Sequence, residues 1–466
     1  MNRLRIMMNN RKRFVFLTAM GAVFVLLASG ANALAFVGYR VLCVPSHTIN
    51  SSCYVPVTEY ATIQAAVTAA NPGDTILVAP GTYPESVTIP TAKSGISLLG
   101  AQAGNDARVD RHDPSKESVV NAAGNAAGST IIVEAINVVI DGFTVEGGGP
   151  LVNATGVDLK GTCPGPPFTP ATGAVVVNNI IQNNGTGVSL NSEGCGMPGM
   201  SGTPLQGVLI EHNLIRNNNV PQGDGIFSSA VSLAFIIENA FAGNETAAIG
   251  INNSQGVIIT NNTSEKDGSF MIFTGTSVSE FSNNQGKEFG AKGTLPGAGD
   301  AAVAIGPGNN GLVITDNDLE EGKAPISNGI AFTTIFGSGP PSTNIYVKNN
   351  RVKCFPGTGI LAEAYEIVPA SPSLPQGTLA LSLILGNEVE DNGLDGIYID
   401  GVIAGNTNNQ LFDNEAEGNQ RFDCHDDTSG GPGTAGTWNR WFNNTGNSSS
   451  PTGLCKPGKR HDYDWR

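Results

Sequence analysis

The chain has 466 residues, of which 60 are glycine, 40% are hydrophobic and only 14% are charged. The glycines do not recur at every third position, which excludes collagen, and a disordered chain would carry more charge and fewer β-branched residues. The formal net charge of −15 argues against nucleic acid as a partner, because phosphate groups would be repelled. Abundant Gly and Asn between short β-branched runs predict many strands joined by tight turns.

Residues 1–35 have the pattern of a secretory signal peptide. Basic residues lie at positions 3–13, an apolar run extends from Phe14 to Leu27, and Ala33-Leu34-Ala35 is a small-residue cleavage site. The apolar run is short for a membrane span, although a retained N-terminal anchor is the alternative. Cleavage would leave 20 basic and 40 acidic residues, a net charge of −20. We therefore expect a secreted or periplasmic protein with no membrane contact after the signal is removed.

Residues 58–72 are predicted to form an N-terminal cap. Thr62 can cap a short helix whose apolar face is Ile63, Val67 and Ala70, and Pro72-Gly73 ends it. A strand at 75–78 and a turn at 80–83 follow. A stack of strands has open ends that must be covered, so this helix should cover the first coil.

One frame repeats along the chain: an apolar residue, two mostly polar ones, Asn, any residue, then a residue that is usually apolar. The spacing between successive Asn residues varies from 22 to 37, which fits a coil of three strands with loops of variable length. We predict an all-β right-handed parallel β-helix of about twelve coils over 36–424, and a β-sandwich is the alternative. Stacked amides can form a hydrogen-bonded ladder. The ladder is predicted at Asn179, Asn213, Asn239, Asn262, Asn284, Asn317, Asn350, Asn387 and Asn414, with Phe143 in an earlier copy.

Residues 425–466 are predicted to be a C-terminal capping tail. An aromatic flap with Trp438, Trp441 and Phe442 would cover the last coil, and a sugar-stacking platform is the alternative reading of these rings. Export permits disulfides. Proximity in the sequence suggests Cys43–Cys53, Cys163–Cys195 and Cys424–Cys455, which leaves Cys354 free.

Candidate chemistry rests on four aspartates that precede Gly or Ala. Asp224, Asp267 and Asp300 are predicted as catalytic acids and Asp395 as a substrate-binding residue, because equal positions in successive coils would stack into one column. Each is also an ordinary turn residue. Asp267 and Asp300 could share a cation such as Ca²⁺, and no metal ligand set is assigned.

Two histidines add to these candidates. His212 lies beside the ladder and is predicted to bind substrate or act as a base, although a solvated strand residue would look the same. His425, with Asp423, Asp426 and Asp427, could hold a metal or form a charged surface patch.

The segments Tyr60–Val67 and Asn71–Tyr83, with the Asn-centred coils, resemble pectin-lyase-like proteins, in particular bacterial right-handed parallel β-helix repeat proteins. The resemblance covers nearly all of the mature chain. Gly81-Thr-Tyr-Pro-Glu85 is similar to the first pectinesterase motif, but the other motifs of pectinesterases and polygalacturonases are absent.

The resemblance implies binding or processing of an extracellular polysaccharide, as a lyase, hydrolase or epimerase, but fold alone does not give function. The alternative is a non-catalytic surface or periplasmic β-helix that binds glycan or protein. The oligomeric state is left open.

Overall fold

The computed structural model describes residues 40–44, 59–109, 111, 113–123, 128–148, 154–160, 171–191, 204–219, 223–290, 300–325, 327–333, 339–364, 378–401 and 405–457. The chain divides at Val41, and the unit Val41–Arg466 holds all the secondary structure described below. The predicted signal peptide lies outside these residues. Within them, no helix has the length and apolar character needed to cross a membrane.

Three long parallel sheets, here named A, B and C, make up this unit. Sheet A has β1 (Val41–Val44), β2 (Thr75–Val78), β5 (Ser97–Leu99), β8 (Val139–Asp141), β11 (Val175–Val177), β14 (Val208–Glu211), β17 (Ser232–Ile237), β20 (Gln255–Thr260), β23 (Glu280–Ser282), β26 (Val313–Thr315), β30 (Tyr346–Lys348), β34 (Leu383–Leu385), β37 (Gln410–Phe412) and β40 (Arg440–Phe442). Sheet B has β3 (Gly81–Tyr83), β6 (Ser118–Asn121), β9 (Phe143–Glu146), β12 (Ile180–Gln182), β15 (Leu214–Arg216), β18 (Ala240–Ala242), β21 (Thr263–Glu265), β24 (Gln285–Phe289), β27 (Asp318–Gly322), β31 (Arg351–Lys353), β35 (Glu388–Glu390) and β38 (Glu415–Glu417). Sheet C has β4 (Val87–Ile89), β7 (Ile131–Val133), β10 (Thr155–Lys160), β13 (Thr186–Asn191), β16 (Ile226–Ser229), β19 (Ala247–Asn252), β22 (Ser269–Thr274), β25 (Ala301–Ile305), β28 (Asn328–Phe332), β32 (Ile360–Ala362), β36 (Ile397–Ile399), β39 (Cys424–Asp426) and β41 (Ser449–Ser450).

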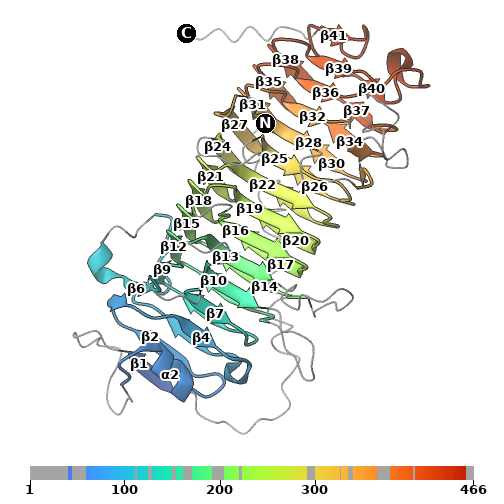
Figure 1. Ribbon diagram of the computed structural model, residues 1–466. Coiled ribbons are helices and arrows are strands. Elements are labelled where there is room, and N and C mark those ends of the chain that lie inside the picture. Colours follow the sequence, from blue (N-terminus) through green and yellow to red (C-terminus); the bar gives the residue numbers. More distant parts are fainter. Residues whose placement is uncertain are drawn as a thin grey trace, which may run out of the picture. The chain divides into compact units, whose positions relative to one another are not determined.

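The chain visits the sheets in the repeated order A, B, C, so each coil adds one strand to every sheet (Figure 1). Two short strands, β29 (Ser342–Thr343) and β33 (Leu379–Ala380), pair at the corner between sheets C and A. Sheets A, B and C have 14, 12 and 13 strands, which confirms the predicted parallel β-helix of about twelve coils. The alternative, a β-sandwich, is wrong.

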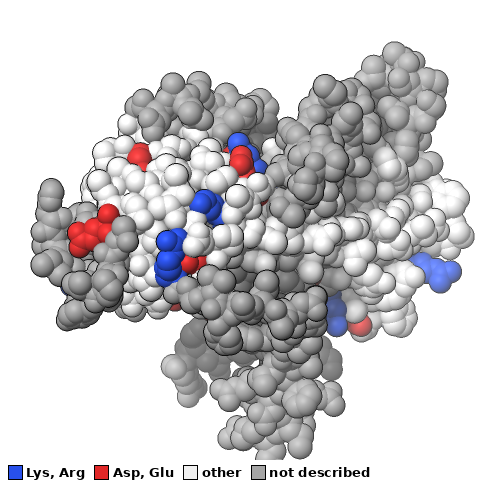
Figure 2. Space-filling view, turned by 90° about the horizontal axis from the view of Figure 1, so that it is seen from below, with Lys and Arg blue, Asp and Glu red and all other residues white. Residues whose placement is uncertain are grey.

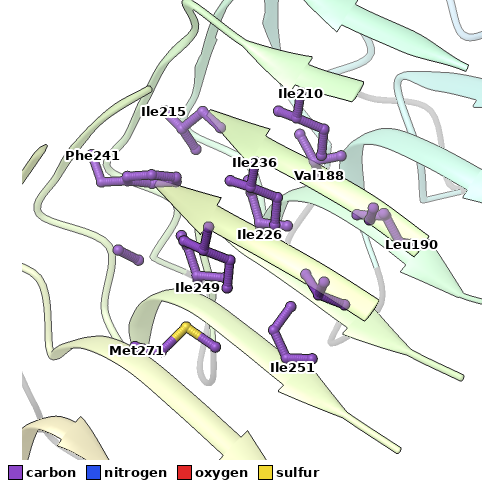
Figure 3. Close-up of a cluster of buried hydrophobic side chains, with 14 of the residues drawn as sticks. Val188, Leu190, Ile210, Ile215, Ile226, Ile236, Phe241, Ile249, Ile251 and Met271 are labelled. Atoms are coloured by element: carbon purple, nitrogen blue, oxygen red, sulfur yellow. The ribbon is translucent and has the colours of Figure 1, made fainter. Parts of the chain in front are cut away.

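The core consists of side chains that point inward from the three sheets. Figure 3 shows part of it, including Val188, Ile226, Ile249 and Met271, which lie in register on four successive strands of sheet C. All four are fully buried. Because strands repeat every ~4.8 Å, each inward position becomes a continuous apolar column, and its burial drives folding.

The predicted Asn ladder runs along the corner between sheets A and B and is confirmed. Asn213, for example, donates from Nδ2 to Asn239 Oδ1 at 3.0 Å, and that oxygen also accepts from the Asn213 backbone N–H. The same pair of bonds links the other predicted members in order, and Asn414 passes it on to Asn444, which the sequence analysis missed. Phe143 N–H donates to Asn179 Oδ1, so Phe143 begins the column.

A second ladder lies at the corner between sheets B and C. Asn184, Asn218 and Asn244 are linked in the same way, and Asn244 donates to Asp267 Oδ1 through both its backbone N–H and its Nδ2. The carboxylate of Asp267 has no N–H, unlike the amide of Asn, so this side chain cannot donate to the next coil and ends the series. Asp423 plays the same part in a later series, where Asn419 donates to its Oδ1.

The N-terminal helix α2 (Ile63–Ala69) buries Ile63, Ala66 and Val67 and packs against β1, β2 and β4. Thr62 caps it as predicted, by accepting from the Ala65 N–H. Glu85 accepts from the backbone N–H groups of Ile63 and Gln64. The Glu of the pectinesterase-like motif therefore stabilises the cap in this chain.

Residues after 424 add β40 to sheet A and β41 to sheet C. The Cys424–Cys455 disulfide is present as predicted, and Cys354 is free and exposed. Cys43 is also disulfide-bonded. Its predicted partner Cys53, and the pair Cys163 and Cys195, lie outside the described residues.

Candidate functional site

The strongest cluster of reactive side chains lies on the outer face of sheet C, near the C-terminal end of the stack. Tyr398 on β36 and His425 on β39 face outward in register on neighbouring coils. Asp395 precedes β36, and Arg421 and Asp427 flank β39. We call Asp395, Tyr398, Arg421, His425 and Asp427 the sheet C cluster.

Arg421 is the only cation of this cluster, and Asp395 holds it. Its Nε donates to Asp395 Oδ1 at 3.0 Å, and its terminal nitrogen lies 2.5 Å from Oδ2 in an ion pair. The backbone N–H of Phe422 donates to the same Oδ1. Asp395 is buried, whereas the Arg421 side chain is 45% exposed. The hydrogen bond to Asp395 raises the pKa of Arg421, so the guanidinium stays charged and faces solvent.

His425 lies between Arg421 and Asp427. Arg421 is 2.8 Å from Nδ1, and Asp395 Oδ1 is farther from that nitrogen at 3.4 Å. Because arginine can only donate, Nδ1 accepts this bond, and Nε2 carries the proton and donates to Asp427 Oδ1 at 3.0 Å. The hydrogen bonds thus assign a neutral imidazole whose lone pair is covered by Arg421.

Tyr398 stacks on the imidazole, with ring centroids 4.3 Å apart and an angle of 14° between planes. Its hydroxyl donates to Asp427 Oδ2 at 2.9 Å. Burial and this hydrogen bond raise the pKa of Tyr398, so the phenol keeps its proton. The Arg421 guanidinium lies 5.0 Å from the Tyr398 ring centroid, in cation–π contact.

Asp400 adds an open hydrogen-bonding position. It follows β36 and lies one coil before Asp427 on the same face. Its Oδ2 accepts from the Ala364 N–H, while its Oδ1 is buried and has no partner in the described part of the chain. A buried acceptor of this kind costs free energy unless a ligand or water satisfies it.

The predicted column of four aspartates is wrong in two of its members. Asp224 and Asp395 do occupy the same register position before their sheet C strands, but six coils apart. Asp267 lies two residues before the residue of that column, Ser269, and Asp300 lies one residue before Ala301. At ~4.8 Å per coil, Asp224 and Asp395 are about 29 Å apart and cannot share a substrate bond.

Asp224 is buried on the outer face of sheet C. An ideal Cβ on Gly250 would lie 3.5 Å from Asp224 Oδ2 and 3.6 Å from the Phe227 ring. Asp224 Oδ1 is buried and has no partner among the residues described. Burial raises the pKa of Asp224 to about 8, although a hydrogen bond from the Ala247 backbone opposes the shift. Its catalytic role stays a prediction.

Asp267 and Asp300 have different surroundings. Asp267 ends the second ladder and also accepts from the Ser264 hydroxyl at 2.6 Å, so it faces the interior. Burial raises the pKa of Asp300, whose backbone carbonyl accepts from Asn328 N–H and Nδ2. Catalysis by either residue stays a prediction, but the shared cation site has no geometric support. Among the described residues, no group of three or more His, Cys, Asp or Glu side chains is arranged to hold a metal.

His212 lies at the corner between sheets A and B, beside the ladder as expected. Its Nε2 is 3.1 Å from Glu238 Oε2, and Arg108 is 3.5 Å from the same oxygen. This surface salt-bridge group is far from sheet C's outer face, so His212 and Asp395 do not form one binding site. A binding role for His212 stays a prediction.

The expected patch of His425 with three acids is correct only for Asp427. Asp426 points inward, where its Oδ2 accepts from Trp441 Nε1 at 2.7 Å and burial raises its pKa. Asp423 ends the later series at the corner between sheets B and C, where it accepts from Asn419. Tyr398 and Arg421 were not predicted from the sequence. One signal could have placed Tyr398 beside His425: these two residues are 27 positions apart, which is also the spacing between the ladder residues Asn387 and Asn414.

Charged side chains are sparse over the described surface seen in Figure 2, as the low charged fraction implies. Two concentrated groups stand out among the described residues: the sheet C cluster, and on sheet B the group of Arg351 with Asp318, Glu320 and Glu388.

Comparisons with known proteins agree with the fold. Residues 137–295 match the family model of a right-handed β-helix region. No curated protein matches the chain. A DFA-IIIase from Arthrobacter chlorophenolicus A6, solved in complex with DFA-III, is 13% identical, with a TM-score of 0.43 over 74% of this chain and 94% of that one. A mutant of the periplasmic alginate epimerase AlgG is 14% identical, with a TM-score of 0.46 over 84% of each chain. The family match and the strand order confirm the predicted resemblance to pectin-lyase-like β-helix proteins at the level of the fold.

Proposed function

We propose that this protein processes an anionic polysaccharide at the sheet C cluster, by removing a proton from the carbon that bears a uronate carboxylate. The observation that carries the proposal is a neutral imidazole, a protonated phenol and a half-exposed guanidinium in mutual contact on one outer face. These are the base, the acid and the cation that such a reaction needs.

Arg421 would bind the substrate carboxylate. A carboxylate at the exposed guanidinium competes with the Arg421–His425 bond, so binding frees the Nδ1 lone pair. Nδ1 then accepts the proton from the adjacent carbon, and the electron pair left behind delocalises into the carboxylate beside Arg421. Charge is thus stabilised where it develops.

Tyr398 would complete the reaction. The electron pair returns to expel the glycosidic oxygen on the neighbouring carbon, and the Tyr398 hydroxyl protonates that oxygen. The products are a saturated chain end and an unsaturated uronate. Acid and base come from neighbouring strands of one sheet face, so they approach the sugar from one side. This arrangement favours a lyase over an epimerase, which needs proton exchange on opposite sides.

The net charge of −15 opposes binding of an anionic polymer. Arg421 offsets this repulsion only locally. Ca²⁺ ions that bridge the polymer and the protein would reduce the repulsion further. The requirement for Ca²⁺ is therefore part of the test.

The experiment is a product screen of the full chain on uronate polymers and on uncharged glucans, with and without Ca²⁺, in D₂O. Unsaturated ends, seen by ultraviolet absorbance, are expected from uronates only, and they should disappear in His425→Gln. Deuterium at the carboxylate-bearing carbon without chain cleavage would indicate an epimerase instead. Neither product from any uronate polymer would overturn the proposal.

A non-catalytic glycan- or protein-binding rod is the second candidate. One observation favours it: both nitrogens of His425 are already bonded within the cluster. Polymer binding without turnover, unaffected by His425→Gln, would support this reading.

A further inference from the structure

The outer face of sheet A carries a second unusual surface, from β26 to β40. The middle residue of each strand here points inward, and the first and third point outward. The register places the outward residues in two rows: Val313, Tyr346, Leu383, Gln410 and Arg440, then Thr315, Lys348, Leu385, Phe412 and Phe442.

Large apolar side chains are exposed on this face. Phe442 is 70% exposed and meets the Phe412 ring edge-on, with centroids 6.1 Å apart. Tyr346 is 49% exposed, and Leu381 and Trp438, at the adjoining corner, are 60% and 39% exposed. A contiguous group of this kind marks a binding surface more often than a scattered apolar residue does. The sheet A patch is defined here as Tyr346, Lys348, Leu381, Phe412, Trp438, Arg440 and Phe442.

The backbone at Leu381 is unusual for a leucine. Its φ is 52°, in the left-handed region, and Gly311, Asn344 and Asn408 hold the same register position with positive φ. Gly and Asn adopt this conformation readily, and a leucine does not. Leu233 and Val278 are also exposed with positive φ at this position of earlier coils, so the conformation belongs to the corner, and the exposed rings and the charge distinguish the patch.

Charge on the patch is opposite to that of the molecule. The ten outward positions include Lys348 and Arg440 and no acidic residue, in a chain of net charge −15. On sheet B, by contrast, Arg351 is neutralised by Asp318, Glu320 and Glu388. The nearest acids by register, Asp316 and Asp413, are at the turns after β26 and β37. Each accepts a hydrogen bond from an Asn of the next coil.

We propose that the sheet A patch is a second, non-catalytic binding surface for an anionic polysaccharide. Ring faces would pack on sugar C–H groups, Lys348 and Arg440 would pair with acidic groups, and the Gln410 and Asn408 amides would bond hydroxyls. The polymer class rests on the proposed function, but binding here requires no chemistry. Lys348 and Arg440 are three coils apart, about 14 Å, so a single sugar cannot engage both.

Affinity electrophoresis of the full chain in gels with alginate, polygalacturonate or an uncharged glucan tests this proposal. Lys348→Glu/Arg440→Glu and Phe442→Ala are each expected to raise the Kd for an anionic polymer about tenfold. Turnover of a short oligosaccharide should stay within twofold of wild type, while KM for the polymer rises. Val278→Asn is the matched control, since Val278 is also exposed with positive φ but lies near Glu280, outside the patch.

Wild-type Kd values in both patch variants would overturn the proposal. A loss of self-association in Phe442→Ala, with polymer binding unchanged, would assign the patch to a second copy of the chain instead. Binding that depends on the patch, without any unsaturated product, would reject the proposed function alone. Product formation with unaltered patch variants would reject the patch alone.

Discussion

Asp224 and Asp395 occupy the same position of the sheet C coil, each followed by Gly-Ile, and yet their surroundings differ. Asp395 is held by Arg421 and has His425 at 3.4 Å. Asp224 has an unpartnered oxygen and a pKa raised to about 8 by burial. The register matches every member of the sheet C cluster with a counterpart around Asp224: Thr246 for Arg421, Gly250 for His425, Phe227 for Tyr398, and Asn252 for Asp427.

A position in the coil of a β-helix therefore does not by itself determine the protonation state or the partners of its side chain. The local sequence Asp-Gly-Ile fixes where the carboxyl points, and the next coil decides its protonation and partners. At Asp395 the next coil supplies Arg421 and His425, and at Asp224 it supplies Thr246 and Gly250. Under the proposed function, only the first arrangement offers a base and a cation to a charged substrate.

The largest effect is expected from removing the imidazole of His425, which lies beside Asp395 and has no equivalent beside Asp224. His425→Gln should lower kcat/KM on a uronate polymer by about 10²–10⁴-fold, because the base is lost. Leu361→Gln is a matched control, two coils earlier in the same column, and should stay within a fewfold of wild type. Thermal unfolding followed by circular dichroism checks that both variants fold. An unchanged rate in His425→Gln would rule out the base assignment.

The next largest effect is the contribution of Asp224 to the pH dependence of the free energy of unfolding. Between about pH 4 and pH 8 the unfolded chain has ionised this carboxyl while the folded chain keeps it protonated, because the folded pKa is raised to about 8. The native state then binds more protons, so its stability falls as pH rises through this window. Asp224→Asn has no such titration. Its free energy of unfolding relative to that of wild type should therefore rise by a few kcal/mol, as an order of magnitude, between pH 4 and pH 8.

Denaturant unfolding of both proteins at pH 5 and pH 8 measures this difference. An equal difference at the two pH values would mean that the carboxyl is ionised in the folded protein. Activity gives a second reading of the same variant. If Asp224 is the catalytic acid predicted from the sequence, Asp224→Asn loses turnover, and otherwise it stays within twofold.

A smaller effect is expected from Asp395→Asn, which weakens the hold on Arg421. Asp395 is a positioning residue, so KM for a uronate polymer should rise about tenfold, or ~1.4 kcal/mol, with a smaller change in kcat. The same substitution at Asp224 is the matched control. Equal KM values in wild type and Asp395→Asn would show that Arg421 needs no partner to bind its substrate.

The fold was predictable because one ladder repeats a chemical requirement in every coil from Asn179 to Asn444. The bend between sheets A and B buries backbone groups, and only an amide with a donor and an acceptor satisfies them on both sides. The second ladder was equally present in the sequence. Asn184, Asn218 and Asn244 each follow a first-ladder Asn by five residues, and Asp267 follows Asn262 by the same interval.

The site was less predictable because loop lengths between sheets B and C vary. Asp224 comes eleven residues after its ladder Asn, and Asp395 comes eight after Asn387. Asp267 also precedes a glycine, but it lies in the second ladder. An Asp-Gly dipeptide alone therefore does not identify the register position that Asp224 and Asp395 share. Tyr398 and Arg421 have no local motif. They become a site only when coil length brings them beside His425.

The smallest and most specific effect is expected when the Asp395 arrangement is transferred to Asp224. Gly250 is the counterpart of His425, and a Cβ there would meet only ordinary contacts, 3.5 Å from Asp224 Oδ2 and 3.6 Å from Phe227. Gly250→His therefore places an imidazole within reach of the unpartnered carboxyl. A hydrogen bond or ion pair favours the ionised form and should lower the pKa of Asp224 by about one unit, ~1.4 kcal/mol.

A lower folded pKa narrows the window in which the native state holds the extra proton. The loss of stability between pH 5 and pH 8 should thus be smaller in Gly250→His than in wild type. Gly250→Ala fills the same space without a partner, so it should keep or enlarge the wild-type loss through further burial. Since the two variants differ only in the imidazole, matching pH profiles would show that the next coil's side chain does not set the protonation of this aspartate.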